Sequence, residues 1–287
     1  MQQMTDRSRH VVVTGAAGGI GRTTASFLAE KGFHVFAGVR KQADVDSLRE
    51  ADIPGVEPLI LEVTEADSIQ AAAEQLAAAL GSQPLHAIVN NAGVTVTCPL
   101  EFVDVDAMRW QFEVNLFGVA AVTRAFLPLL RRPGGRVVNV SSGAGQIALP
   151  LIGPYVASKF ALEGMSDVLR LELRHQGIGV SVIVPGVIQS GMHDKNRAAT
   201  QSLLDSLPPQ GLEKYGAAIE RLRENDARDS AKSAPATEVA EAIHRALTAR
   251  RPRTRYPVTK EVKLLSWVGA FLGDRARDAI MGRMVGL

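Results

Sequence analysis

A glycine-rich segment between an apolar run and a helical stretch constrains the fold of this chain more than any other feature. Residues 10–14 (HVVVT) are typical of a buried strand, residues 14–21 (TGAAGGIG) form a turn, and residues 22–31 have helical spacing. In such a turn, glycines allow a sharp bend and let backbone approach a pyrophosphate. The helix would present its N–H groups and positive dipole end to the phosphates. The alternative is a turn that is merely rich in glycine.

Strands and helices alternate along most of the chain. Apolar β-branched runs predict further strands over residues 34–39, 56–63, 85–90, 136–141 and 179–184, with a last short strand at 254–256. Apolar spacing predicts helices over residues 64–80, 105–130, 153–176 and 237–250. This alternation predicts an α/β fold with a doubly wound parallel sheet, the Rossmann fold, as a single domain over residues 8–260.

Three segments stand apart from that rhythm. Residues 187–233 form a polar insertion after the sixth strand and are expected to be a lid over the substrate, the alternative being a loose surface excursion. Residues 261–287 are amphipathic and are expected to cover the core or a subunit interface, with a membrane surface as the alternative. A basic cluster is expected to be a solvated face rather than a site for an acidic partner; its members are Arg250, Arg251, Arg253 and Arg255.

Composition excludes several classes of protein. The 287 residues, 46% hydrophobic and 22% charged, suit one large domain with a sizeable core. The formal net charge of +2 gives no argument for nucleic acid or a membrane surface. Neither a membrane span nor a signal peptide is expected, because no long apolar run is present and the first ten residues lack an apolar stretch. The single cysteine, Cys98, fits a reducing compartment, so a cytoplasmic location is expected.

Tyr155 and Lys159 lie four residues apart on a predicted helix and therefore share one face. A free tyrosine has a pKa of about 10, and a nearby ammonium favours the phenolate. Lowering that pKa by roughly three units requires about 4 kcal/mol. Beside a nicotinamide, such a tyrosine would take a proton from an alcohol while the carbon gives up hydride. The same spacing also occurs by chance on surface helices.

The end of the second strand indicates which dinucleotide the chain prefers. An acidic residue there would bind the ribose 2′-hydroxyl of NAD(H). This chain has Arg40 and Lys41 instead, and no carboxylate before Asp44. The planar guanidinium of Arg40 suits a 2′-phosphate, which predicts a preference for NADP(H), with NAD(H) as the second cofactor. The alternative is that both cations lie on a solvated loop.

Five motifs, taken together and in this order, resemble the short-chain dehydrogenase/reductase family. They are TGAAGGIG at 14–21, NNAG at 90–93, Asn115, Ser142 with Tyr155 and Lys159, and Pro185-Gly186. Ser142 precedes Tyr155 by thirteen positions, the usual spacing in the family. The resemblance runs from about residue 10 to residue 191. Within the family, the segments around these motifs look similar to the branch of steroid, retinol and hydroxybutyrate dehydrogenases.

The resemblance implies a role for each catalytic candidate. Tyr155 would be the general acid/base, and Lys159 would lower its pKa and bind the nicotinamide ribose. Ser142 would hold the substrate oxygen, a role for which Ser141 is the competing candidate. Asn115 would anchor a water that relays protons to Lys159; the alternative is a polar residue that bends its helix.

The resemblance also assigns cofactor contacts. The pyrophosphate would lie on Gly15, Gly19, Ile20 and Gly21, the adenosine on Glu62, Val63, Asn91 and Gly93, and the nicotinamide on Pro185, Gly186 and Ser190. Two positions depart from the family pattern: relatives usually have aspartate in the region of Glu62-Val63, and often threonine where this chain has Ser190. Apolar residues around the expected centre agree with a lipophilic substrate, or else are sheet-edge packing: Val94, Ala144, Ile147, Leu149 and Met192.

The implied activity is an NADP(H)-dependent oxidoreductase that interconverts a secondary alcohol and a ketone, or an aldehyde, as its small-molecule substrate. A homodimer or homotetramer is expected, joined through the long helices at residues 105–130 and 153–176. No metal site is expected. The second interpretation is a sensor or scaffold that binds NADP(H) on the same fold without turning it over, since a fold does not establish a function.

Overall fold

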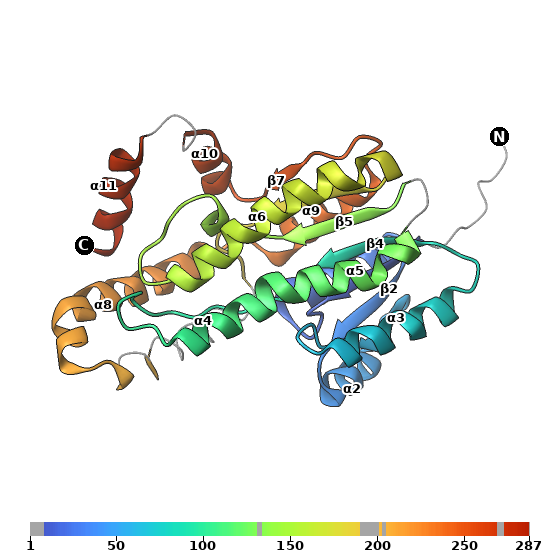
Figure 1. The fold of residues 1–287 in the computed structure, drawn as a ribbon, viewed down its shortest axis with the longest axis horizontal. Coiled ribbons are helices and arrows are strands. Elements are labelled where there is room, and N and C mark those ends of the chain that lie inside the picture. The colour runs from blue at the N-terminus through green and yellow to red at the C-terminus, as the bar shows by residue number, and fades with distance from the viewer. Residues whose placement is uncertain (1–8, 131–133, 190–200, 203–204, 269–272, 287) are drawn as a thin grey trace.

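A single parallel sheet organises the molecule. The computed structural model describes residues 9–130, 134–189, 201–202, 205–268 and 273–286. Seven strands pair in the order β3-β2-β1-β4-β5-β6-β7 (Figure 1). Their bounds are β1 Arg9–Thr14, β2 Phe33–Val39, β3 Val56–Ile60, β4 Leu85–Asn90, β5 Arg136–Val140, β6 Gly179–Val184 and β7 Arg255–Pro257. The predicted doubly wound sheet is confirmed, and its order reverses between β1 and β4, where ligands of such sheets bind at the carboxyl ends.

Helices cover both faces of this sheet. One face carries α1 (Gly19–Glu30), α2 (Gln42–Glu50) and α9 (Ala236–Thr248), and the other carries α3 (Ala66–Leu80), α4 (Val105–Phe112), α5 (Gly118–Leu130) and α6 (Gly153–Leu173) (Figure 1). The strands supply both layers of the core, because successive side chains point to opposite faces. Val11 and Val13 of β1 pack with the first set of helices, while Val12 packs with the second.

The predicted long helix over residues 105–130 has a local irregularity. Between α4 and α5, Glu113–Phe117 (η1) forms a turn of π-helix, a feature often found at functional sites. The run Val105–Leu130 is long and apolar enough, by length and composition, to cross a membrane. In the fold it lies against the sheet, where Val122, Phe126 and Leu130 are fully buried. We therefore regard it as a core helix.

The insertion after β6 contains a long helix, α8 (Pro209–Lys232), which the polar sequence did not predict. Its buried residues Ala218 and Ile219 form a small separate core with Cys98 and Leu151. The described part of the insertion is therefore a docked element and not a loose excursion. Beyond β7, the described residues form α10 (Lys260–Val268) and α11 (Asp274–Val285), and α11 lies beside α8 (Figure 1).

Two further boundaries differ from the predictions. The third strand ends at Ile60, so Glu62 and Val63 lie in the loop that follows it. The helix α2 was not predicted, because only Val45 and Leu48 are buried among its nine residues and so leave little periodic signal.

Candidate active site

The β1–α1 turn forms a tight backbone cradle. Gly15 and Gly19 have φ of 67° and 52°, in the left-handed region that favours glycine. A Cβ at Gly21 would collide with the carbonyl oxygen of Gly15 and lie 2.6 Å from Nδ2 of Asn91. Gly18 caps α1 in an extended conformation; its first turn has neither a side-chain cap nor an acidic residue within the described residues. The open N–H groups and positive helix end therefore fit a bound phosphate.

Asn91 fastens this cradle to the end of β4. Its Nδ2 donates to the carbonyl oxygens of Thr14 and Gly15, at 2.9 and 3.3 Å. The Thr14 hydroxyl accepts from the backbone N–H groups of Asn91 and Ala92, both at 3.0 Å. The two strands beside the switch point are thus held in register at their carboxyl ends. Thr14 was not among the predicted site residues, because its side-chain role depends on a partner 77 residues away.

Tyr155, Lys159 and Ser142 come together at the carboxyl ends of β5 and β6. The Lys159 side chain is buried, donates from Nζ to the carbonyl oxygen of Val140 at 2.9 Å, and lies 5.7 Å from the centre of the Tyr155 ring. Tyr155 shares a side-chain hydrogen bond with Ser142. Ser142 also accepts from the N–H of Ala144 at 3.2 Å. Ser141, the competing candidate, has a buried hydroxyl with no hydrogen-bond partner among the described residues.

Burial shifts the pKa values of both Lys159 and Tyr155. It lowers the pKa of Lys159 from 10.5 to about 8, and the negative charge of Glu163 acts against that shift. Burial also raises the pKa of Tyr155, while the hydrogen bond with Ser142 lowers it. The predicted lowering of the Tyr155 pKa is not found in this structure, because burial is the largest cause and raises that pKa. Tyr155 keeps its phenolic proton at neutral pH.

Asn115 lies within the π-turn and is fully buried. Its Oδ1 accepts from the N–H of Val94 at 2.9 Å, and its Nδ2 donates to the carbonyl of Val94 at 3.0 Å and to Ser158 Oγ at 3.1 Å. Gln111, also fully buried, donates to the same carbonyl and accepts from the N–H of Val96 at 2.6 Å. The two amides clamp the segment after NNAG. Gln111 was not among the predicted site residues, although its spacing of four from Asn115 on a predicted helix was an available signal.

Gly93 joins this clamp to the catalytic pair. A Cβ at this position would lie 3.5 Å from Oδ1 of Asn115 and 3.8 Å from Nζ of Lys159. Pro185 follows β6, and its carbonyl accepts from the N–H of Gly143 at 2.9 Å. Gly186 packs so closely on Thr259 that a Cβ would collide with its hydroxyl. These residues border the same sheet edge.

The remaining candidates are more scattered. Arg40 and Lys41 are exposed at the end of β2, and Glu62 is half-buried with Oε1 accepting from the Thr64 hydroxyl at 3.2 Å. The apolar candidates divide between buried residues (Val63, Ala144 and Ile147) and half-buried ones (Ile20, Val94 and Leu149). Ala144 and Ile147 are almost fully buried in this structure, with 3% and 5% of their surfaces exposed. Ser190 and Met192 lie outside the described residues.

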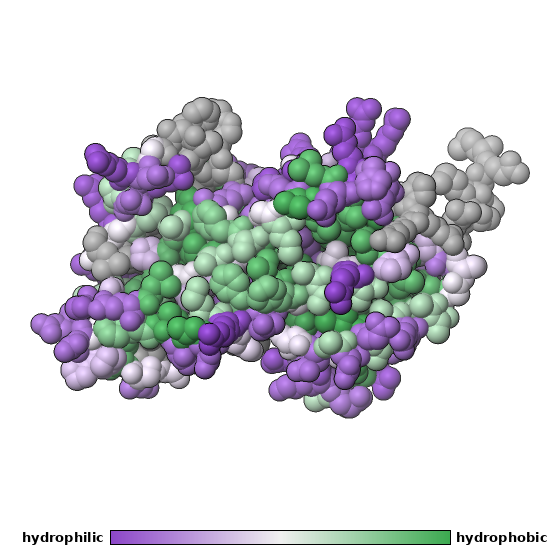
Figure 2. All heavy atoms as spheres, viewed as in Figure 1, coloured by the Kyte–Doolittle hydropathy of each residue, from purple (hydrophilic) through white to green (hydrophobic). Residues whose placement is uncertain are grey.

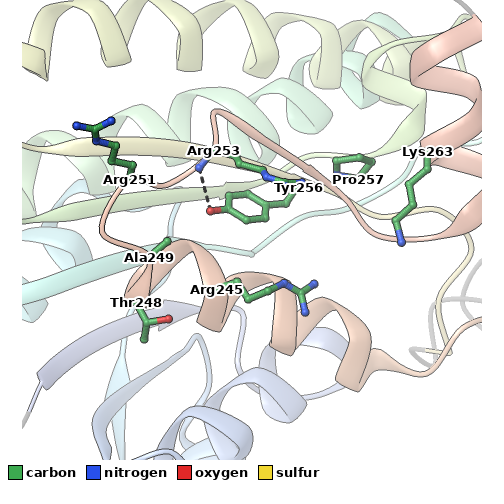
Figure 3. Close-up of a pocket in the computed structure, with 8 residues that line it drawn as sticks. All are labelled: Arg245, Thr248, Ala249, Arg251, Arg253, Tyr256, Pro257 and Lys263. Atoms are coloured by element: carbon green, nitrogen blue, oxygen red, sulfur yellow. Dashed lines mark hydrogen bonds between the residues drawn. The ribbon is translucent and has the colours of Figure 1, made fainter.

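A surface pocket of about 660 Å³ lies away from this centre, between α9, β7 and α10 (Figure 3). The cations Arg245, Arg251, Arg253 and Lys263 line it, with Arg251 and Lys263 at opposite ends of the view. Three members of the predicted basic cluster are exposed, as expected of a solvated face. Arg255 differs: it is partly buried and pairs with Glu163 and Asp167, both at 2.8 Å.

Comparison with known proteins decides the family. A family model described as short chain dehydrogenase matches residues 9–201. The chain belongs to the short-chain dehydrogenase family. A 3-amino-tetrahydro-pyrrolizinone reductase of Xenorhabdus hominickii is 34% identical over 92% of this chain and 90% of its own length. Mouse retinol dehydrogenase 16 is 35% identical, over 93% and 87%.

Solved structures agree with this assignment. A short-chain dehydrogenase from Burkholderia cenocepacia in complex with NADP has a TM-score of 0.72 and 26% identity, over 96% of this chain and 97% of that one. One from Burkholderia phymatum in complex with NAD has a TM-score of 0.73 and 27% identity, over 91% and 92%. This short-chain dehydrogenase is therefore an oxidoreductase acting on CH–OH groups with a nicotinamide dinucleotide, near the retinol and steroid dehydrogenase branch.

Proposed function

We propose that this short-chain dehydrogenase is NADP(H)-dependent and interconverts a secondary alcohol and a ketone, or an aldehyde, with Tyr155 as general acid/base. The observation that carries this proposal is the meeting of Tyr155, Ser142 and Lys159 beside the glycine cradle of β1 and α1. The cofactor, when bound, supplies the hydride chemistry. The first turn of α1 would hold its phosphates, and Lys159, Pro185 and Gly186 would border the nicotinamide end.

The chain's own residues supply the proton and orient the substrate oxygen. In the direction of reduction, Tyr155 donates its phenolic proton to the substrate oxygen, and the Ser142 hydroxyl donates a hydrogen bond to the same oxygen. The raised pKa of Tyr155 suits this direction, because the group must carry its proton before it can give it. Asn115 and Gln111 hold the segment at Val94 and so fix one wall of the site. Asn115 would also retain the relay water that leads to Lys159.

Absorbance of reduced nicotinamide tests the proposed activity. The protein would be mixed with NADPH or NADH and a panel of ketones and aldehydes, from small ones to steroids and retinal. We expect turnover with at least one lipophilic carbonyl compound and a higher kcat/KM with NADPH. Tight NADPH binding without turnover of any panel member would favour the sensor interpretation. Failure to bind either dinucleotide would contradict the proposed cofactor site.

Arg40 provides a direct test of cofactor preference. It is exposed at the end of β2, where it can approach a 2′-phosphate. Arg40→Ala is expected to reduce the preference for NADPH over NADH by about 10–100-fold, the value of one or two charge-assisted hydrogen bonds. The ratio of the two kcat/KM values measures the change. Arg49→Ala, at the other end of α2, is the matched control and should leave the ratio as it is; an unchanged ratio in Arg40→Ala would refute the assignment.

Substrate choice is proposed to lie with α8 and the segment before it. The helix α8 is fastened to the loop before α4: Lys214 pairs with Glu101 at 2.7 Å, and the Tyr215 hydroxyl donates to Glu101 at 3.0 Å. Phe102 and Tyr215 meet edge to face with ring centres 6.0 Å apart. This contact supports the proposal that α8 belongs to a substrate lid, because the loop that it touches follows the carboxyl end of β4. A lipophilic substrate agrees with the apolar lining at Val94 and Leu149.

An exposed apolar surface supports the proposed homo-oligomer. Figure 2 shows hydrophobic side chains over the face where α5 and α6 run in Figure 1. Its exposed large members are Trp110, Phe117, Phe160, Val168 and Leu171. A continuous apolar patch on a helical layer is typical of a subunit interface, and a second copy would cover it with the same helices.

A cytoplasmic location is also proposed, because the chain has a single cysteine. Subcellular fractionation tests this proposal.

Substitution of Val168 tests the proposed subunit interface. Val168 is 53% exposed in the carboxyl-terminal half of α6, so Val168→Glu would place a charge within the apolar patch. We expect light scattering to give a dimer or tetramer for the wild type and a monomer for Val168→Glu. Leu264→Glu, at a position on α10 that is 64% exposed, is the control and should keep the wild-type mass. A monomeric wild type would exclude the oligomer.

A further inference from the structure

We propose that Glu163 is a positioning residue for Lys159: its buried carboxylate, held by Arg255 of β7, keeps the lysine ammonium charged and in place beneath Tyr155. This inference rests on the proposed function, in which Lys159 acts with Tyr155. It gives the last strand of the sheet a part in the catalytic centre. It also explains why Arg255, unlike the other arginines of the basic cluster, is partly buried.

The geometry places Glu163 between the catalytic lysine and the ion pairs at β7. Glu163 follows Lys159 by one turn of α6, so both side chains lie on the same face of that helix. Both residues are buried, with 4% of Lys159 and 6% of Glu163 exposed. Oε2 of Glu163 accepts from Nε of Arg255 at 2.8 Å, while Oε1 is buried without a hydrogen-bond partner among the described residues.

A buried carboxylate oxygen without a partner is costly unless a charge compensates it. The close approach of Gly143–Gly145 (η2) creates this burial, because a Cβ at Gly145 would lie 3.2 Å from Cγ of Glu163 and 3.1 Å from the carbonyl oxygen of Lys159. Glycine at this position thus lets the backbone cover the carboxylate. The ammonium of Lys159 is the positive charge left to balance it.

Arg255 pairs with two carboxylates, those of Glu163 and Asp167, so Glu163 is not its only counter-ion. Asp167 pairs with Arg170 at 2.8 Å and with Arg255 at 2.8 Å. Asp167 therefore has two cations, and Arg255 keeps one partner if the charge of Glu163 is removed. Among the residues that the structure describes, Glu163 is the charged group that acts on Lys159, and no second one is found. The contacts of the Lys159 Nζ with the other described residues are neutral: the carbonyl of Val140 on β5 and the Tyr155 ring on its own helix.

Loss of the Glu163 charge should make Lys159 give up its proton at lower pH. Burial already lowers the pKa of Lys159 to about 8, and Glu163 is the group whose charge raises it. The Lys159 ammonium is charged below this pKa and becomes neutral as pH rises through it. Glu163→Gln should lower the pKa by roughly one further unit, as expected for one charge about a helical turn away in a partly shielded site. The amide keeps the shape of the side chain.

Competitive acylation of Lys159 tests this without any turnover. The protein would be labelled with acetic anhydride over a range of pH, and the peptide containing Lys159 quantified by mass spectrometry. We expect labelling of the wild type to begin near pH 8 and that of Glu163→Gln roughly one unit lower. Glu172→Gln, the same change at an exposed position of α6, should match the wild type. Glu163→Asp retains the charge but moves it, so its labelling profile should lie between those of the wild type and Glu163→Gln.

The pH dependence of the rate of carbonyl reduction supplies the second measurement. In the wild type, carbonyl reduction should fall at alkaline pH as Lys159 loses its charge; in Glu163→Gln this fall should move down by roughly one unit. Equal labelling profiles for wild type and folded Glu163→Gln would overturn the proposal. If Glu163→Gln does not fold, Glu163→Leu takes its place as a second neutral replacement of similar size, and a wild-type labelling profile in it would overturn the proposal. Because labelling requires no substrate, an inactive wild type would refute the proposed function and leave this test intact.

Discussion

Replacement of Tyr155 by phenylalanine is expected to lower kcat for carbonyl reduction by about 10²–10⁴-fold, the usual contribution of a general acid. The change removes only the hydroxyl that shares a hydrogen bond with Ser142, and it leaves the ring near Lys159 in place. Because the glycine cradle of α1 lies elsewhere, the Kd for NADPH should change little. Absorbance of NADPH measures turnover, and quenching of protein fluorescence measures binding.

A matched substitution separates chemistry from stability in this experiment. Tyr256 is buried on β7 and packs on the face of the sheet that α9 covers, opposite the face of α6, and its hydroxyl accepts from the N–H of Arg253 at 3.0 Å. Tyr256→Phe also removes a buried phenolic hydroxyl, and it should cost about 1 kcal/mol of unfolding free energy with little change in kcat. If Tyr155→Phe retained wild-type turnover, Tyr155 could not be the acid, and the proposed mechanism would be wrong.

The second large effect is expected at Gly21. A methyl group there would collide with the carbonyl oxygen of Gly15 and lie 2.6 Å from Nδ2 of Asn91, so the turn and the end of β4 would have to separate. Gly21→Ala should lower the free energy of unfolding by about 1–3 kcal/mol, as overpacking of a close backbone contact does. It should also raise the Kd for NADPH by roughly tenfold or more, because the phosphate cradle is displaced.

Gly18 offers the control for this prediction. It lies three residues earlier, in the same turn, and a Cβ there would meet no atom within 4 Å. Its φ of −170° is extended backbone that alanine also adopts. Gly18→Ala should therefore remain near the wild type in urea unfolding. Equal losses in the two variants would show that glycine content, and not the contact at Gly21, determines the stability of the turn.

The parts of the fold that could be predicted depend on local patterns. The apolar runs of β1, β4 and β6 are short, continuous and bounded by turn residues, so their places follow from the sequence alone. The Tyr155–Lys159 pair could be found because both members lie on one helix. Ser142 could be added only through the family spacing, since its contact with Tyr155 joins two separate elements.

The parts that could not be predicted depend on contacts between distant segments. Arg255 was expected in a solvated cluster, yet its partner Glu163 lies 92 residues earlier on α6. The helix α8 was obscured by its polar composition, because only one stripe of it packs against Cys98 and Leu151. The pKa of Tyr155 was expected to fall, but a sequence gives the nearby charge and not the depth of burial that opposes it.

Isotopic transfer from the cofactor to the product tests the central claim most directly. The protein would be given NADPH carrying deuterium at C4 of the nicotinamide, on either face in separate reactions, with the best carbonyl compound of the panel. We predict that one of the two reactions places a single deuterium on the carbinol carbon of the product alcohol, and that Tyr155→Phe does so far more slowly. Bound NADPH with no deuterium in any product, from either face, would contradict the proposed hydride transfer.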